Sequence, residues 1–278
     1  MTVTVVPTVQ LNSGRAMPNF GLGTWKLSDD QAQLIVGEAI NIGYRMFDTS
    51  DQYRNEAGIG RAVAESGLPR DELFVTSKVW AADGYDSTLR AFDASMIRLG
   101  FDVIDLYLMH WPRMEVALTK GAWRAFERLL NDGRCRSIGV SNFKFDDLTC
   151  LLSYASTPPS VNQIQLNPWC PQAAQRTFHN RFDIITQAWG PLGRGRKNLD
   201  SPILVSIASK YGRSPAQIVL RWSLQLGNSV IPKTGTFERL QENISIFDFD
   251  LDEYDIYAMS LLDERLSMTE QSFEGRIS

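Results

Sequence analysis

The fold is decided by the stretch Gly43-Tyr-Arg-Met-Phe-Asp-Thr-Ser-Asp-Gln-Tyr-Arg-Asn-Glu-Ala-Gly58. The apolar pair Met46-Phe47 predicts the end of a buried strand, and Asp48 follows where that strand leaves the core. Polar residues 50–52 then break the apolar pattern, so Tyr53 is predicted to lie in a loop. A carboxylate at a strand end, followed closely by a phenol, is the first sign of a site.

Two further predicted strands end in chemically useful groups. Lys78 follows Leu73-Phe-Val-Thr-Ser77, and His110 follows Val103-Ile-Asp-Leu-Tyr-Leu-Met109. In a parallel sheet, the carboxyl ends of neighbouring strands meet at one edge. A phenol, an ammonium, a carboxylate and an imidazole would therefore meet if these strands lie side by side.

Length and composition are those of an ordinary globular chain. The 278 residues are 44% hydrophobic and 22% charged. Single α/β barrels run to ~250 residues, so we expect residues 1–278 to form one domain. The net charge is −4 and there is no long basic run, which argues against a nucleic-acid partner.

Cysteine and histidine usage predicts neither a metal site nor a disulfide framework. The three cysteines, Cys135, Cys150 and Cys170, lie far apart, and the chain has two histidines. The N-terminus does not resemble a signal peptide, and no apolar run approaches the ~20 residues of a membrane span. We expect a cytoplasmic protein without membrane contact, and a monomer, because nothing in the sequence demands a partner.

A strand followed by a helix recurs along the chain. Residues 3–11 and 15–18 predict a hairpin around the turn Asn12-Ser13-Gly14. The first helix of the repeat is predicted to begin at Ser28, with Gln31 completing a capping box. Eight strands are predicted, over 20–25, ending at 48, 78 and 110, and over 137–142, 161–166, 183–189 and 230–233. A last amphipathic helix is predicted over 251–262.

Repeated strand–helix units imply right-handed crossovers and a parallel sheet. A doubly wound open sheet would usually carry a GxGxxG fingerprint after its first strand. Gly21 and Gly23 instead lie within the predicted strand and are followed by Trp25-Lys26. The predicted fold is therefore an α/β (β/α)8 TIM barrel with an N-terminal β-hairpin and an extra C-terminal helix.

Several enzyme chemistries do not fit the residues at the strand ends. Asp48 has no second acid at a neighbouring strand end, as glycoside hydrolysis would need, and no GxSxG elbow occurs. A Schiff-base lyase using Lys78 remains an alternative. That chemistry needs a neutral lysine, whereas a lysine facing Asp48 stays charged.

A charged lysine suits a phenol that donates a proton. Beside Lys78, Tyr53 is expected to release its proton more readily than a free phenol of pKa ~10, while staying protonated at rest. Asp48 would hold Lys78 in place, and His110 would donate a hydrogen bond to a substrate carbonyl oxygen. Such a set of residues protonates an oxygen that is gaining negative charge, but it supplies no electrons. We therefore expect a bound reductant.

The later strand ends suit a nicotinamide cofactor. Trp189 offers a flat face for the ring, and Ser141-Asn142 with Gln163 offers partners for its carboxamide. Gly190-Pro-Leu-Gly-Arg-Gly195 forms a backbone-rich loop suited to a pyrophosphate. Lys233-Thr-Gly-Thr-Phe-Glu-Arg239 places two cations at a helix N-terminus, which favours a further phosphate and hence NADP over NAD.

These motifs resemble the aldo-keto reductases over nearly all of the chain. The matching pieces are Gly43-Tyr-Arg-Met-Phe-Asp-Thr49 with Tyr53 and Asn55-Glu56, Leu106-Tyr-Leu-Met-His-Trp-Pro112, Ser137-Ile-Gly-Val-Ser-Asn-Phe143, Val161-Asn-Gln-Ile-Gln-Leu166, and Ile231-Pro-Lys-Thr234 with Arg239 and Glu242-Asn243. Within the family, the run Trp189-Gly-Pro-Leu-Gly193 is most similar to the bacterial 2,5-diketo-D-gluconate reductase branch.

The resemblance implies an NADPH-dependent carbonyl reductase that passes a hydride to an aldehyde or ketone. It implies that Tyr53 is the proton donor, supported by Asp48, Lys78 and His110. The implied NADP(H) contacts are Gly23, Thr24, Trp25, Ser141, Asn142, Gln163, Trp189, Gly190, Leu192, Gly193, Lys233, Thr234, Arg239, Glu242 and Asn243.

Three tryptophans are expected to wall the substrate pocket beside His110, namely Trp25, Trp80 and Trp111. The chain departs from the family pattern at Thr234, where serine is common, but it keeps the hydroxyl. A non-catalytic nicotinamide sensor on the same fold remains a further alternative.

Overall fold

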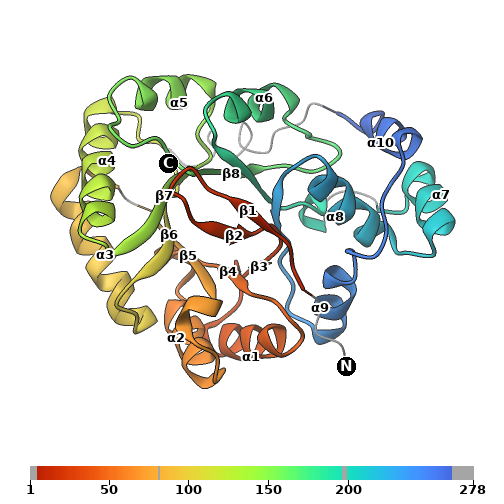
Figure 1. Cartoon of the computed structure of the whole chain (residues 1–278), viewed down its shortest axis with the longest axis horizontal. Coiled ribbons are helices and arrows are strands. Elements are labelled where there is room, and N and C mark those ends of the chain that lie inside the picture. The colour runs from red at the N-terminus through yellow and green to blue at the C-terminus, as the bar shows by residue number, and fades with distance from the viewer. Residues whose placement is uncertain (1–4, 81, 196–198, 265–278) are drawn as a thin grey trace, which may run out of the picture.

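An N-terminal hairpin precedes a barrel (Figure 1). The structure is a computed structural model, and it describes residues 5–80, 82–195 and 199–264. Strands β1 (Thr8–Gln10) and β2 (Ala16–Pro18) pair antiparallel, with Val9 opposite Met17. The predicted hairpin is thus confirmed, although its first strand begins at Thr8 and is shorter than the predicted 3–11. Residues 3 and 4 of that range lie outside the described part.

The second sheet has eight strands, all parallel to their neighbours, in the order β10-β9-β8-β7-β6-β5-β4-β3. Two parallel bridges, Phe20 with Val230 and Gly23 with Lys233, join the first and last strands. The predicted barrel is confirmed. Its strands are β3 (Leu22–Gly23), β4 (Met46–Asp48), β5 (Phe74–Val79), β6 (Ile104–Met109), β7 (Cys135–Ser141), β8 (Val161–Gln165), β9 (Ile185–Trp189) and β10 (Ser229–Ile231).

The first barrel strand is shorter than the predicted 20–25. β3 pairs with β4 at Leu22 and Gly23, and the chain then turns, with Leu27 N donating to Thr24 O at 3.1 Å. Thr24 and Trp25 therefore belong to the loop above the barrel rather than to the strand.

Helices surround the barrel (Figure 1). Their order follows the predicted repeat, with α7 and α8 both between β9 and β10, and α10 as the extra helix. They are α1 (Asp29–Asn41), α2 (Glu56–Glu65), α3 (Tyr85–Leu99), α4 (Val116–Asn131), α5 (Phe145–Leu152), α6 (Ala173–Arg181), α7 (Pro202–Tyr211), α8 (Pro215–Gln225), α9 (Phe237–Ile244) and α10 (Glu253–Ser260). The 3₁₀ turns are η1 (Asp51–Tyr53), η2 (Arg70–Glu72) and η3 (Gly193–Gly195).

Local sequence sets the helix starts. Gln31 N donates to Ser28 Oγ at 3.2 Å and Ser28 N donates to Gln31 Oε1 at 3.0 Å, which confirms the capping box of α1. Ser214 caps α8 in the same way, with Pro215 in its first turn. These side chains satisfy backbone N–H groups that have no partner inside the helix.

The core has two layers. Between strands and helices lie large buried side chains such as Phe47, Tyr107 and Trp123. Inside the barrel, Met17 of the hairpin packs in one cluster with Met46 and other strand residues. The hairpin therefore fills the amino-terminal end of the barrel, and the carboxyl ends of the strands remain for a site.

Candidate active site

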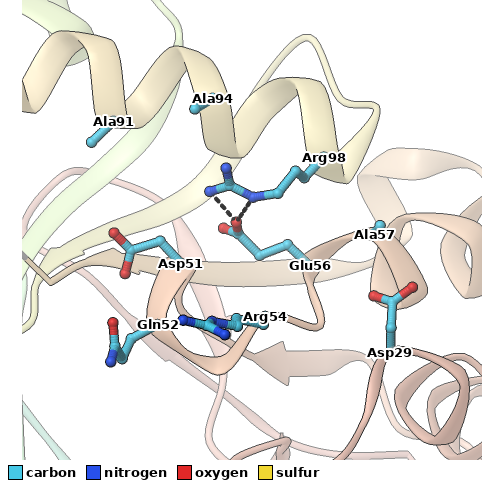
Figure 2. Close-up of a pocket in the computed structure, with 9 residues that line it drawn as sticks. All are labelled: Asp29, Asp51, Gln52, Arg54, Glu56, Ala57, Ala91, Ala94 and Arg98. Atoms are coloured by element: carbon cyan, nitrogen blue, oxygen red, sulfur yellow. Dashed lines mark hydrogen bonds and ion pairs between the residues drawn. The ribbon is translucent and has the colours of Figure 1, made fainter.

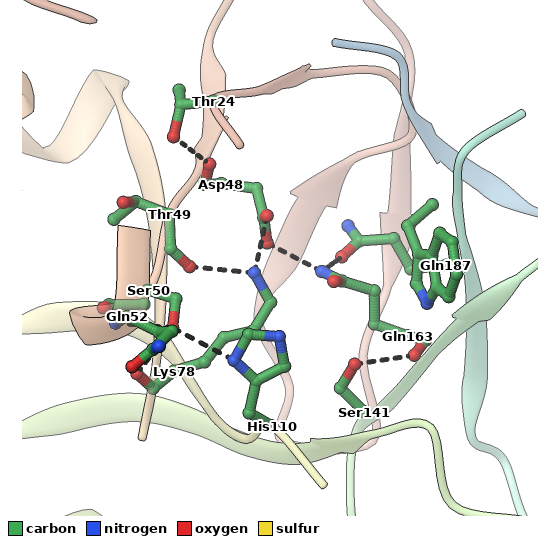
Figure 3. Close-up of polar contacts among 12 residues, drawn as sticks. Thr24, Asp48, Thr49, Ser50, Gln52, Lys78, His110, Ser141, Gln163 and Gln187 are labelled. Carbon is green, nitrogen blue, oxygen red and sulfur yellow. Dashed lines mark hydrogen bonds and ion pairs between the residues drawn. The ribbon is translucent and has the colours of Figure 1, made fainter. Parts of the chain in front are cut away.

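A buried ion pair lies at the ends of β4 and β5. Lys78 Nζ donates to Asp48 Oδ1 at 2.6 Å and to the backbone oxygen of Thr49 at 2.8 Å (Figure 3). Burial by itself lowers the pKa of Lys78, but Asp48 and Tyr53 raise it, and the net direction is upward. Lys78 is therefore an ammonium ion at neutral pH.

Tyr53 lies on η1 directly beside this ammonium. Lys78 Nζ is 4.9 Å from the centre of the Tyr53 ring. Burial raises the pKa of the phenol, Lys78 opposes this, and Asp48 adds to it, so the net direction is upward. The expectation of an easier proton release is corrected for the ligand-free protein, because enclosure in the barrel mouth outweighs the neighbouring cation. The phenol is protonated at rest, as expected.

His110 directly follows β6 and is 7% exposed. Its ring centre is 5.7 Å from that of Tyr53, with the planes 76° apart. Burial lowers the pKa of His110 well below its usual value, and Lys78 lowers it further. The imidazole is therefore neutral at pH 7, and its Nδ1 lies 3.0 Å from Ser50 Oγ.

Gln163 of β8 joins the ion pair to the next strands. Its Nε2 donates to Asp48 Oδ2 and to Gln187 Oε1, both at 2.7 Å (Figure 3). Ser141 Oγ donates to the backbone oxygen of Gln163 at 2.9 Å. Both amide hydrogens of Gln163 are thus already used, which leaves its oxygen for a carboxamide N–H.

Asn142 fixes the indole that was expected to face the nicotinamide. Trp189 Nε1 donates to Asn142 Oδ1 at 2.9 Å, and Asn142 Nδ2 donates to the backbone oxygen of His110 at 3.0 Å. The backbone of Asn142 has φ 61, a left-handed conformation that asparagine tolerates better than most residues. The indole face is held in place before any ligand binds.

These groups open into one cavity of about 1370 Å³. Two of the predicted site residues do not line the cavity: Lys78 is buried beneath its lining, and Gly193 lies in η3. The other predicted residues line the cavity, namely Gly23, Thr24, Trp25, Asp48, Tyr53, Trp80, His110, Trp111, Ser141, Asn142, Gln163, Trp189, Gly190, Leu192, Lys233, Thr234, Arg239, Glu242 and Asn243.

All three tryptophans line the cavity, and they make different contacts there. Trp80 packs edge-on against His110 with ring centres 5.0 Å apart, and it also contacts Trp111 at 6.4 Å. Trp25 instead contacts Arg194, whose guanidinium lies 4.3 Å from the centre of the Trp25 ring. Arg194 also lies 5.6 Å from the Trp189 ring, so it bridges the two indoles across the cavity.

A cluster of cations lies at the far end of the cavity. Burial lowers the pKa of Lys233, and the nearby charges of Lys26 and Arg239 lower it further. Mutual repulsion of this kind marks a place where an anion would be stabilised. Glu242 of α9 accepts a hydrogen bond from Ser214 Oγ, and its backbone oxygen accepts one from Gln217 Nε2 at 3.0 Å.

Sequence reasoning missed three residues of the site: Ser50, Gln187 and Arg194. Gln187 precedes Trp189 by two positions, so strand alternation alone places both side chains on one face. Ser50 stood within the decisive stretch but was read only as a break in the pattern. Arg194 was read as part of a backbone loop, and no sequence rule places its side chain between two indoles.

A second hollow, of about 390 Å³, lies behind η1 between α2 and α3 (Figure 2). Its carboxylates are already engaged. Glu56 accepts hydrogen bonds from Ser77 Oγ at 2.5 Å and Arg98 Nε at 2.7 Å, and Asp51 accepts from Trp80 N at 3.1 Å. These contacts fix η1 from its outer side. Gln52 lines both this hollow and the large cavity.

Across the described residues, no helix is long and apolar enough to cross a membrane. The same part of the chain contains no group of three or more His, Cys, Asp or Glu residues that is suited to a metal ion.

Comparison with known proteins gives consistent matches. Residues 18–264 match the sequence profile of the Aldo/keto reductase family. A glyoxal reductase of Bacillus subtilis (strain 168) is 44% identical over 270 residues, covering 96% of this chain and 97% of the relative. An aldo/keto reductase structure from Brucella melitensis has 48% identity and a TM-score of 0.89, covering 93% of this chain and 100% of the other. A Bombyx mori aldo-keto reductase in complex with NADP has 31% identity and a TM-score of 0.90, covering 97% and 98%.

Proposed function

The chain belongs to the aldo/keto reductase family and is an NADP-dependent oxidoreductase acting on carbonyl compounds, and we propose that Tyr53 is its proton donor. The single observation that carries the proposal is the proximity of the Tyr53 phenol, which lines the cavity, to the buried ammonium of Lys78 beneath it. Lys78 Nζ lies 4.9 Å from the Tyr53 ring centre and 2.6 Å from Asp48 Oδ1.

The residues of the cavity fit NADP(H). Trp189 presents an indole already fixed by Asn142, and Lys26, Lys233 and Arg239 supply positive charge at the other end. When bound, NADPH supplies the hydride. Gln163 would offer its carbonyl oxygen to the carboxamide, and Lys233 with Arg239 would hold the phosphates.

Tyr53 donates the proton to the oxygen on which negative charge develops. Lys78 stabilises the phenolate that remains, because a cation beside a phenolate favours its charged form. Asp48 and the Thr49 carbonyl hold the ammonium in position. The indoles of Trp80 and Trp111, which contact each other beside His110, would enclose the carbonyl end of a substrate and limit water, and this would strengthen these charge interactions.

Replacing Tyr53 with Phe tests the proposal. Tyr53→Phe should lower kcat for aldehyde reduction by roughly 100-fold or more, the range of a general acid, and leave the Kd of NADPH nearly unchanged. Turnover is followed by NADPH absorbance and binding by quenching of tryptophan fluorescence. The matched control is Tyr257→Phe, a largely exposed tyrosine on α10. Wild-type turnover by Tyr53→Phe would refute the role.

The natural carbonyl substrate is the finer part of the proposal. A relative named glyoxal reductase favours small aldehydes, and the resemblance to the diketogluconate reductase branch favours keto sugars. A panel containing both classes, assayed with NADPH, separates the two. The cytoplasmic location and the monomeric state stay predictions, to be checked by fractionation and by light scattering.

The geometry disfavours the two alternatives. A Schiff base needs a neutral lysine, whereas Asp48 and Tyr53 keep Lys78 charged. Borohydride should therefore trap no aldehyde on Lys78. A sensor without activity has no need of a phenol beside an ammonium, and aldehyde-dependent NADPH oxidation would exclude it.

A further inference from the structure

Four buried polar side chains form one hydrogen-bonded chain inside the barrel. Asp48, Gln163, Gln187 and Ser229 belong to β4, β8, β9 and β10, and each is at most 3% exposed. Gln163 Nε2 donates to Asp48 Oδ2 and to Gln187 Oε1, both at 2.7 Å (Figure 3). Gln187 Nε2 in turn donates to Ser229 Oγ at 3.2 Å. The chain thus runs from the ion pair beside Tyr53 to the last strand of the barrel.

The ion pair fixes the direction of this chain. Asp48 is held as a carboxylate by the Lys78 ammonium, 2.6 Å away, and a carboxylate only accepts hydrogen bonds. The Gln163 atom that lies 2.7 Å from Asp48 must therefore be the amide nitrogen and not the amide oxygen. With the amide reversed, two acceptor oxygens would face each other at hydrogen-bond distance.

The same reasoning fixes the amide of Gln187. Its atom 2.7 Å from the Gln163 nitrogen must be the oxygen, because two amide nitrogens at that distance would be donors without an acceptor. The Gln187 nitrogen then points the other way, with Ser229 Oγ at 3.2 Å and Met46 Sδ at 3.6 Å as acceptors. Both amide orientations therefore follow from the charge on Lys78.

The carbonyl oxygen of Gln163 is the part of this amide that remains for a ligand. Asp48 and Gln187 use its two amide hydrogens, and within the described residues no protein donor reaches the oxygen. Gln163 lines the cavity, whereas Gln187 is fully buried and is not part of the lining. Without the acceptor on β9, only the bond to Asp48 would hold the amide, and its plane could turn about the last side-chain bond.

We propose that Gln187 is a positioning residue for the cofactor. By accepting the second amide hydrogen of Gln163, it directs the oxygen of Gln163 at the N–H group of the nicotinamide carboxamide. The inference rests on the proposed contact between Gln163 and the carboxamide, and it assigns a role to a residue that does not touch the cavity. Loss of one hydrogen bond between neutral groups changes affinity by roughly 3- to 10-fold.

A cofactor analogue isolates this contact. Acetylpyridine adenine dinucleotide phosphate carries an acetyl group in place of the carboxamide, so it keeps the carbonyl and lacks the N–H group. The Kd of the oxidised analogue is divided by that of NADP⁺, each measured by quenching of tryptophan fluorescence without substrate. Gln163→Leu should lower this ratio by roughly 3- to 10-fold relative to the wild type, because NADP⁺ alone loses a hydrogen bond.

Variants of Gln187 test the positioning role. Gln187→Leu removes the acceptor and should lower the ratio in the same direction as Gln163→Leu. Gln187→Glu keeps an oxygen at this place in either protonation state and should retain the wild-type ratio. Gln225→Met is the matched control, because the Gln225 amide also hydrogen-bonds through both ends, to the backbone of Leu251, and lies outside the cavity lining. Circular dichroism checks folding, and Gln187→Met is a second variant without the amide oxygen.

The outcomes separate the two levels of the proposal. A ratio unchanged by Gln163→Leu would show that the carboxamide contact is absent, and both levels would fall. If Gln163→Leu lowers the ratio and Gln187→Leu or Gln187→Met does not, the positioning role alone is overturned. An equal fall in Gln187→Leu and Gln187→Glu would also overturn it, because packing and not the hydrogen bond would then be responsible. Binding is measured without turnover, so the result does not depend on the role of Tyr53.

Discussion

Lys78 is a fully buried ammonium that donates hydrogen bonds to two partners. Asp48 accepts from it at 2.6 Å and the Thr49 carbonyl at 2.8 Å, while Gln163 donates to the second oxygen of Asp48. A buried charge is costly unless it is paired and hydrogen-bonded. In the proposed mechanism the pair is therefore a fixed electrostatic support for Tyr53, which would need no rearrangement during the reaction.

The second histidine gives a residue-scale prediction. His179 is buried; its Nδ1 lies 2.8 Å from Thr186 Oγ1, and Asn162 Nδ2 donates to its Nε2 at 3.0 Å. Burial lowers the pKa of His179 to about 4, so between that pH and ~6.5 the unfolded chain binds the extra proton. This contribution to stability is present above pH ~6.5 and is lost as the pH falls.

Lowering the pH from 7 to 4.5 should remove about 2.5 kcal/mol through this one group. Urea unfolding at both pH values measures the change. Other groups titrate equally in both proteins, so the free energy of unfolding of His179→Gln should also fall over the same range. The fall should be smaller than in the wild type. Parallel pH dependence in the two proteins would show that His179 is not responsible.

At the scale of elements, α2 and α3 approach each other through Gly60. A Cβ on Gly60 would lie 2.1 Å from the backbone oxygen of Leu99, a contact that no side-chain rotation can relieve. The close approach also helps Arg98 of α3 reach Glu56 of α2, at 2.7 Å. This packing supports the outer side of η1, on which Tyr53 lies.

Gly60→Ala should destabilise the fold by about 3 kcal/mol or more, because overpacking against backbone forces the helices apart. Gly37→Ala is the matched control: Gly37 lies within α1, and a Cβ there meets nothing within 4 Å. That change should stabilise by about 0.5–1 kcal/mol, since alanine favours helix. Equal urea midpoints for the two variants would contradict the packing argument.

At the scale of the whole molecule, closing the barrel brings opposite ends of the chain together. Gly23 bridges to Lys233, so the loop after β3, with Lys26, lies against the loop after β10. The charges of Lys26 and Arg239 both lower the pKa of Lys233. If these cations bind the third phosphate as proposed, selection for it depends on a site assembled from both halves of the sequence.

Removing one of these cations should affect NADPH more than NADH. Arg239→Ala should raise the KM of NADPH by roughly 10- to 100-fold, the value of a charge-assisted hydrogen bond, with little change in the KM of NADH. Initial rates with each cofactor give the ratio, and Arg181→Ala on α6 is the control. An equal loss for both cofactors would argue against a phosphate contact.

Sequence predicted the elements well because periodicity and capping are local properties. The capping box at Ser28 and the strand end at Asp48 are set by residues within a few positions of each other. β3 was predicted too long, since its length depends on where the chain must turn above the barrel.

By itself, the sequence determined the order of strands and helices, and hence which strand ends meet at one edge of the barrel. Only the tertiary structure decided what those ends do to one another. The upward shift in the pKa of Tyr53, the two engaged hydrogens of Gln163, and the contact between Ser50 and His110 all join separate segments of the chain. Electrostatic and hydrogen-bond energies depend on distance and burial, and neither is fixed until the barrel closes.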